Sequence, residues 1–237
     1  MKRYLSILVV SMLLVLVLVS LSLQAAADES SNINVVSKTD EGSNKYIEWK
    51  LETPQVKGLE NRKVEKSINK EFARTVNDFK NRLTTEAKKS YKESEKEGFP
   101  FRKFVAQTVY SVHYLDSNTL SLTMDLYEFT GGAHGFTTRL AFNYDLKTGK
   151  KLGYQDVLKG CPNYKDIIVN EIIKQIEANP DIYFADATET VKGFTDEQPF
   201  YITKDGIVVY YGLYEIAPYV SGIREFLIPY SAFKCCL

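Results

Sequence analysis

The stretch LENRKVEKSINKEFARTVNDFKNRLTTEAKKSYKESEKE, residues 59–97, decides the fold. Its apolar side chains recur at intervals of 4, 4, 4, 3, 4, 4 and 4 residues, from Val64 through Ile68, Phe72, Val76, Phe79, Leu83 and Ala87 to Tyr91. This spacing places them on one face of a helix, which Gly98 and Pro100 end. A single apolar face predicts packing on a sheet; a solvent-exposed coiled coil is the alternative.

Strand patterns lie on both sides of this helix. Before it, residues 45–56 (KYIEWKLETPQV) predict one strand. After it, residues 101–115, 120–126 and 136–144 alternate apolar and polar side chains with a period of two. Short turns separate these three segments, so the sequence predicts an antiparallel meander.

The last hundred residues predict a second unit. A shorter helix fits residues 163–178, and strand patterns occupy 200–203, 207–213 and 224–229. The order of strand, long helix, strands, shorter helix and strands indicates an α+β fold rather than alternating βαβ units. We expect an antiparallel β-meander packed against one long amphipathic helix in a first α+β domain (45–135), and a second α+β unit with a shorter helix and antiparallel strands (136–237).

The N-terminus predicts export. Lys2 and Arg3 precede an apolar run over residues 5–23, and three alanines end at Ala27, the pattern of a secretory signal peptide over residues 1–27. An uncleaved membrane anchor is the alternative, because the run approaches the length of a bilayer span. Residues 28–44 are polar and predict a flexible leader. Either way the protein works outside the cytoplasm, which excludes ATP-driven, nucleic-acid and cytosolic redox functions.

Charge and cysteine content narrow the class further. Without residues 1–27 the chain has 28 basic and 30 acidic side chains, a formal charge of −2. This balance indicates that the protein lacks the excess of positive charge that binds nucleic acid or an anionic membrane surface. In an oxidising compartment Cys161 could bridge to Cys235 or Cys236, and three unpaired thiols are the alternative.

A glycine-rich segment, YEFTGGAHG at residues 127–135, is the first candidate site. Its glycines indicate a bent backbone that presents a functional side chain, and its candidate binding residues are Tyr127, Glu128, Gly131, Gly132, His134 and Gly135. Glu128 and His134 would form an acid/base pair if the turn folded one over the other. The alternative is a conformational turn with a hydrogen-bonding histidine. The other histidine, His113, fits a strand position.

A second candidate, GLYEIAPYVSG at residues 212–222, interrupts two strand patterns. Proline restricts its backbone and its tyrosines offer contact area at small entropic cost. Its candidate binding residues are Tyr214, Glu215, Pro218, Tyr219 and Gly222. Two interpretations stay open: a rigid aromatic binding loop, or a wide connection whose tyrosines enter the core.

Catalytic and cofactor motifs are absent from the sequence. The chain has no Gly-x-Ser-x-Gly elbow and no phosphate-binding loop, and its two histidines have no zinc-ligand spacing. The sequence therefore implies no enzyme, no cofactor and no metal site.

The two candidate segments, together with NYDLKTGK (143–150), QPFYI (198–202) and KDGIVVYY (204–211), carry a family resemblance. From residue 35 to 233 the chain resembles paired bacterial extracytoplasmic domains of unknown function. These occur in the extracellular region of the lysozyme-sensing anti-sigma factor RsiV and in the non-catalytic N-terminal region of the peptidoglycan deacetylase PdaC. The resemblance implies an α+β fold and a role in recognising muramidases or cell-wall material.

The chain departs from both relatives. Only a few residues precede the apolar run and few follow Phe233, so we expect neither a sigma-binding nor a deacetylase domain. We expect a secreted or tethered, non-enzymatic module of the cell envelope that recognises a lysozyme-like protein or a peptidoglycan fragment, with no nucleic acid and no membrane partner. One alternative is a peptidoglycan-modifying hydrolase or deacetylase-like enzyme that uses Glu128 and His134. The other is a purely structural interaction domain with buried tyrosines.

Overall fold

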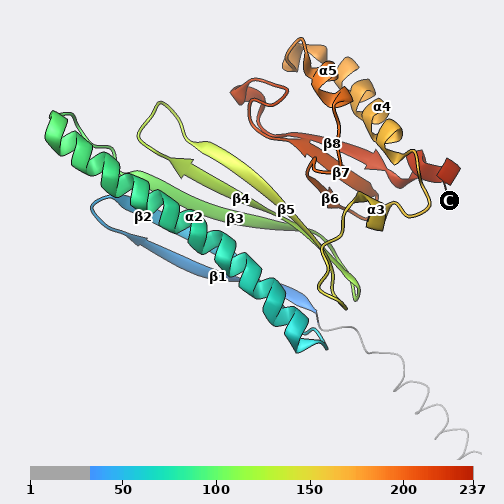
Figure 1. The fold of residues 1–237 in the computed structure, drawn as a ribbon, viewed down its shortest axis with the longest axis horizontal. Helices are drawn as coiled ribbons and strands as arrows, with labels where there is room; N and C mark the ends of the chain where they lie inside the picture. The colour runs from blue at the N-terminus through green and yellow to red at the C-terminus, as the bar shows by residue number, and fades with distance from the viewer. Residues whose placement is uncertain (1–32, 237) are drawn as a thin grey trace, which may run out of the picture. The chain divides into compact units, whose positions relative to one another are not determined.

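The computed structural model describes residues 33–236, with side chains as far as Phe233, and this part of the chain contains two sheets (Figure 1). The larger sheet has the order β1 (Asn34–Ser43), β2 (Ile47–Lys57), β3 (Phe104–Leu115), β4 (Thr119–Phe129) and β5 (Phe136–Asp145). The smaller contains β6 (Phe200–Ile202), β7 (Gly206–Tyr211) and β8 (Arg224–Pro229). The helices are α2 (Arg62–Glu97), α3 (Tyr154–Val157), α4 (Tyr164–Glu177) and α5 (Ala187–Lys192). The predicted signal peptide lies outside the described residues.

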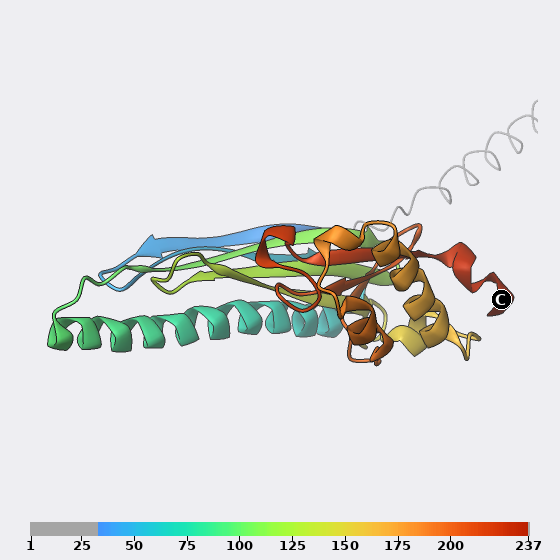
Figure 2. The same cartoon turned by 90° about the horizontal axis from the view of Figure 1, so that it is seen from above.

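The long helix confirms the prediction from its apolar spacing. α2 runs for 36 residues along the large sheet (Figures 1 and 2), and seven of the eight predicted apolar positions are buried. They share one core with strand residues such as Leu51, Leu122 and Phe142, so the coiled-coil alternative is wrong. The C-terminus of α2 follows the sequence too: Gly98 adopts a left-handed conformation, φ 75°, and its N–H donates to the Ser94 carbonyl at 2.9 Å.

Strand β1 corrects the predicted flexible leader. Residues 34–43 pair antiparallel with β2 along their whole length, for example Val35 with Val56. Val35 packs on the core, and the Trp49 ring lies so close to Gly42 that a Cβ there would be 2.5 Å from it. The polar composition misled the prediction because an edge strand needs few apolar side chains once its backbone is paired. Residues 28–32 lie outside the described part.

The expected α+β class is confirmed, and the structure adds one feature and moves one boundary. β2 and β3 pair in parallel, with Ile47 opposite Phe104, and α2 is the crossover between them, so the fold contains one βαβ unit. β5 pairs with β4 and completes the large sheet, so the first unit extends to Asp145 rather than ending at residue 135. The predicted meander β3-β4-β5, the helix α4 and the strands β6 to β8 are confirmed.

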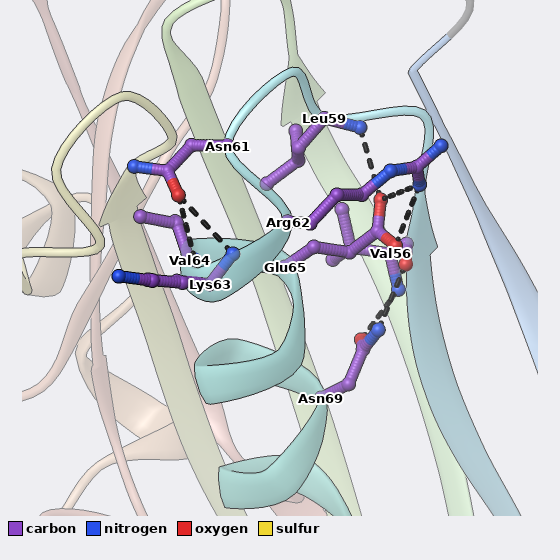
Figure 3. Close-up of polar contacts among 8 residues, drawn as sticks. All are labelled: Val56, Leu59, Asn61, Arg62, Lys63, Val64, Glu65 and Asn69. Atoms are coloured by element: carbon purple, nitrogen blue, oxygen red, sulfur yellow. Dashed lines mark hydrogen bonds and ion pairs between the residues drawn. The ribbon is translucent and has the colours of Figure 1, made fainter.

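Polar side chains tie the start of α2 to β2 (Figure 3). The Asn61 side chain caps the helix by accepting from the N–H groups of Lys63 and Val64, at 3.1 and 3.3 Å. About two turns later, Asn69 both accepts from the Val56 N–H at 2.7 Å and donates to the Val56 carbonyl at 2.8 Å. This side-chain amide satisfies both backbone groups of Val56 where β2 ends.

The small sheet packs on the face of the large sheet that α2 leaves free. The Asn143 amide donates to the Phe200 carbonyl at 2.9 Å, and Ser121 Oγ accepts from the Ile202 N–H at 2.8 Å. Ser121 and Asn143 are both buried. Because successive strand residues point to opposite faces, the apolar neighbours of these residues, such as Leu122 and Phe142, face α2.

A charged and aromatic group continues this interface. Arg139 on β5 makes a two-pronged contact with Asp125 on β4, at 2.6 and 2.7 Å, and reaches Glu225 on β8 at 2.5 Å. Beside it, the His113 ring stacks on Tyr201 with centroids 3.8 Å apart. The two sheets are therefore joined by partnered polar groups as well as by apolar contact.

Cys161 is disulfide-bonded and buried. Cys235 and Cys236, the other cysteines of the sequence, have side chains outside the described residues. Which of the two bridges to Cys161 stays a prediction.

We predict that Asn69→Ala lowers the free energy of unfolding by about 2 kcal/mol, because both backbone groups of Val56 lose a partner in a part-buried site. Asn77→Ala is the matched control, since Asn77 is exposed on the same helix. Urea unfolding measures both variants. Equal stability of the two would contradict a role for Asn69 in joining α2 to β2.

His113 predicts a loss of stability at mildly acidic pH. Burial between the sheets lowers its pKa below the ordinary value, although Glu225 opposes the shift. A histidine whose pKa is lower in the folded protein than in the unfolded chain contributes fully to stability above about pH 6.5, the ordinary histidine value. As the pH falls below that value, the unfolded chain takes up the proton first and the contribution is lost. The free energy of unfolding should therefore fall as the pH drops below about 6.5, above the range in which carboxylates titrate.

The variant His113→Gln should flatten this pH dependence, and His134→Gln, which changes the other histidine, should keep it. Urea titrations at several pH values give the comparison. A His113→Gln protein with the same pH profile as the wild type would show that the effect arises elsewhere.

Candidate functional site

The structure brings the two candidate segments together. The His134 ring, in the β4–β5 turn, lies 4.1 Å from the Tyr219 ring with a tilt of 30°, and Tyr219 Oη donates to the Gly135 carbonyl at 2.9 Å. The Tyr214 ring is 5.7 Å from the Tyr219 ring, with its hydroxyl 3.5 Å from His134 Nε2. We call these three side chains the aromatic cluster. His134 is 80 residues from Tyr214 in sequence, so the cluster joins two distant segments.

Glycines give the β4–β5 turn its shape. A Cβ on Gly135 would lie 2.4 Å from the Tyr127 ring, so only glycine lets that ring pack against the backbone. Gly131 has φ 93°, and Arg102 donates to the Gly132 carbonyl at 3.2 Å. Tyr127 thus packs against the backbone of the turn, while the His134 ring contacts the neighbouring loop.

The second segment is a rigid loop. Ile216 and Ala217 are buried and anchor its middle, and Pro218 precedes a short 3-10 turn, Tyr219–Ser221. Gly222, at φ 69°, ends that turn. Tyr214 also adopts a left-handed backbone, φ 67°, which is uncommon for a residue with a side chain and recurs at functional sites.

Exposure separates the roles of the loop residues. Tyr214 is 50% exposed and Glu215 is exposed as well, whereas Tyr219 is half-buried and holds the two segments together. Tyr219 therefore lies between the two segments, and Tyr214 is presented to solvent; a binding role for the loop stays a prediction. Val220 projects furthest, with 91% of its surface exposed.

Sequence reasoning missed a third segment beside the loop. Ser221 Oγ donates to the Ile182 carbonyl at 3.1 Å, and the Phe184 N–H donates to the Ile216 carbonyl at 3.0 Å. Ile182 and Phe184 are exposed. The run Ile182-Tyr183-Phe184 after Pro180 was the available signal, since three large apolar residues outside any strand or helix pattern are unusual on a surface.

Glu128 belongs to a different environment. It forms an ion pair with Arg82 of α2, and this contact raises the pKa of the Arg82 guanidinium. Strand alternation accounts for the separation, because Tyr127 faces the turn and Glu128 faces the helix. The structure does not pair Glu128 with His134, so the acid/base pair considered from the sequence is not formed.

A shallow pocket of about 360 Å³ adjoins the aromatic cluster at Tyr219. It is lined by Asp125, Thr137, Arg139, Leu213, Tyr219, Gly222, Ile223 and Glu225. Arg139 binds both carboxylates of this pocket, Asp125 and Glu225, so one positive charge faces two negative ones. The pocket therefore adds polar contacts and a partly compensated negative charge beside the aromatic cluster.

The described residues, 33–236, hold no group of three or more His, Cys, Asp or Glu side chains arranged for a metal ion. None of the helices in that part of the chain has the length and apolar character needed to cross a bilayer.

Comparison with known proteins follows the two sheets. Residues 40–137 match the family model described as deacetylase PdaC, and residues 155–231 match a family described as a protein of unknown function, DUF3298. The chain is 29% identical over 126 residues to the peptidoglycan-N-acetylmuramic acid deacetylase PdaC of Bacillus subtilis, over 52% of this chain and 27% of that protein. It is 27% identical over 191 residues to the anti-sigma-V factor RsiV of Bacillus subtilis, over 76% of this chain and 61% of that protein.

A solved structure of a DUF3298 family member from Bacteroides fragilis has the same fold. Its TM-score is 0.66 at 20% identity, over 89% of this chain and 95% of that one. The resemblance to paired domains of unknown function is therefore confirmed. The chain spans about a quarter of PdaC and about three fifths of RsiV.

We predict that Gly135→Ala lowers the free energy of unfolding by about 1–3 kcal/mol and separates Tyr219 from the turn, because the new methyl group overlaps the Tyr127 ring. Gly132→Ala is the control, since its Cβ would have no atom closer than 4.0 Å. Urea unfolding gives the stabilities, and the ring-current shift of the His134 protons in NMR spectra reports the contact with Tyr219. Unchanged stability in Gly135→Ala would mean that Tyr127 moves aside freely.

Proposed function

We propose, for a chain that pairs a PdaC-like region with a DUF3298 region, a non-enzymatic binding function at the bacterial cell envelope. The binding surface consists of the aromatic cluster and the adjoining exposed residues Glu215, Val220, Ile182 and Phe184. The leading candidate partner is a lysozyme-like protein, and the second candidate is a peptidoglycan fragment.

One observation carries this proposal: two segments far apart in sequence converge to present Tyr214, half-exposed, on a backbone held in a left-handed conformation. A purely structural role would bury this side chain, because burial is what gives a large aromatic residue its stabilising effect. An exposed tyrosine on a rigid loop instead offers contact area that loses little conformational entropy on binding.

The chemistry of the surface favours a protein over a free sugar. Val220, Ile182 and Phe184 add exposed aliphatic and aromatic area, which is typical of protein-binding patches. Glu215, Asp181 and Asp186 are exposed around them and have no ion pair in the described part of the chain. Unpaired carboxylates at the rim of an apolar patch complement a basic partner and steer its approach.

The relatives support the location and the kind of partner. PdaC is named for an action on peptidoglycan N-acetylmuramic acid, a cell-wall component. A module that accompanies such an activity would meet both wall fragments and the proteins that cut the wall. Export through residues 1–27, with release or tethering, belongs to the same proposal.

We predict that the exported chain binds hen lysozyme in isothermal titration calorimetry and that Tyr214→Ala weakens this binding at least tenfold, as for a central aromatic residue of an interface. Phe99→Ala is the matched control: Phe99 is also 50% exposed but belongs to the segment between α2 and β3 and not to the loop. This control should bind as the wild type does.

Titration with muropeptides tests the second candidate partner. Binding of muropeptides without binding of lysozyme would replace the protein by a glycan as the partner. Wild-type protein that gives no heat with either ligand at high micromolar concentration would overturn the proposal, as would equal weakening by Phe99→Ala.

A further inference from the structure

The outer surface of α2 carries a row of cations opposite its buried stripe. Its members are Lys63, Lys66, Lys70, Arg74, Lys88 and Lys92, and all are exposed. Their separations of 3, 4, 4, 14 and 4 residues are close to whole numbers of helical turns, so they share one line along the helix. We call this row the basic ridge.

The ridge is almost free of neutralising partners. Arg74 pairs with Asp78 at 3.5 Å in a fully solvated contact, and the five lysines have no ion pair in residues 33–236. Other cations of the helix do have them, as in Lys80 with Asp40 and Arg82 with Glu128. Asn77, Asn81 and Thr85 fill the middle of the line, so it carries no carboxylate before Glu95.

The near-neutral total charge conceals this separation. Residues 62–97 contain 11 basic and 7 acidic side chains, whereas the rest of the chain from residue 28 contains 17 basic and 23 acidic ones. A helix with a positive outer side is thus joined to a protein that is otherwise negative. Interspersed charges would cancel within a Debye length of roughly 8 Å, but a row along one helix keeps its field.

The ridge differs from the aromatic cluster in position as well as in charge. α2 packs on the face of the large sheet that contains Leu122 and Phe142, and the small sheet packs on the opposite face through Ser121 and Asn143. Figures 1 and 2 show α2 running along the large sheet as its outer layer. A ligand on the ridge would leave the aromatic cluster free.

The geometry of the ridge selects the shape of its ligand. The row consists of two runs, Lys63 to Arg74 and Lys88 to Lys92, within which neighbouring cations lie roughly 4.5–6 Å apart along the helix axis. A gap of roughly 21 Å separates the runs, and the whole row extends over about 44 Å at 1.5 Å per residue. Apolar side chains are missing from the row, so it has nothing to insert into a lipid bilayer.

We propose that the basic ridge binds a linear polymer with a phosphodiester in each repeat, the chemistry of anionic envelope polymers. Ammonium and guanidinium groups in two runs along one line match a flexible chain of single negative charges without fixing its sequence or register. Such binding is dominated by release of counterions, so it is strongly salt-dependent. It would hold the protein at the wall while the aromatic surface remains accessible.

The test is binding of fluorescent poly(glycerol phosphate) to the exported chain at several salt concentrations. With six contacts and the counterion release of a flexible single strand, log K should fall with log salt at a slope of about −4. The variant Lys63→Gln/Lys66→Gln/Lys70→Gln/Arg74→Gln should reduce the slope by about 3 and the affinity at low salt at least tenfold. Circular dichroism and thermal unfolding verify that this variant stays folded.

The matched control removes four exposed lysines from other elements, Lys50→Gln/Lys147→Gln/Lys159→Gln/Lys204→Gln, and so makes the same change in net charge. Its slope and affinity should remain close to those of the wild type. An equal loss in the control would show that net charge alone governs binding and would overturn the ridge. Two results with the wild-type protein would also overturn the proposal. One is no binding of the polymer at low salt. The other is tighter binding to vesicles with about 30% phosphatidylglycerol, an anionic content on the order of that in membranes, than to the soluble polymer.

Discussion

Burial of a single apolar stripe on one long helix is the constraint on which the structure depends. A helix of 36 residues with one apolar face must cover a sheet of matching length, and the large sheet supplies it with Leu51, Leu122 and Phe142. Because α2 also connects β2 to β3, its burial forces these two strands to run parallel. The rest of the large sheet then adds by antiparallel pairing, β1 on one side and β4 and β5 on the other.

The same constraint leaves the other face of the large sheet open for the small sheet. That interface differs from the helix interface in chemistry, since it includes Arg139 with its two carboxylates, the stack of His113 on Tyr201 and the buried pair Ser121 and Asn143. Buried polar groups cost free energy unless each finds its partner, so they fix one relative arrangement of the two sheets. The loop that carries Tyr214 and Tyr219 gains its position from this arrangement, because the small sheet brings it to the β4–β5 turn.

Charge shows why composition and position must be considered separately. Because the numbers of basic and acidic residues are nearly equal, the sequence predicted no anionic partner. That prediction considers only the electrostatic field averaged over the whole protein. The helical period concentrates lysines on the side of α2 that faces solvent, while several acidic residues pair with cations across the fold, as Glu128 does with Arg82. A total charge near zero thus permits a negative rim around one surface and a positive row along another.

The sequence by itself determined the elements that depend on local periodicity. The stripe from Val64 to Ala87 fixed α2, period-two alternation fixed β3 to β5, and Gly98 fixed a helix end, because each of these signals lies within neighbouring residues. Tertiary structure alone decided the rest: polar residues 34–43 became a strand because β2 offered unpaired backbone groups, Glu128 was assigned to Arg82 instead of His134, and Ile182 and Phe184 joined the loop. These contacts join segments that are distant along the chain, and a spacing pattern within one segment contains no information about which other segment will lie against it.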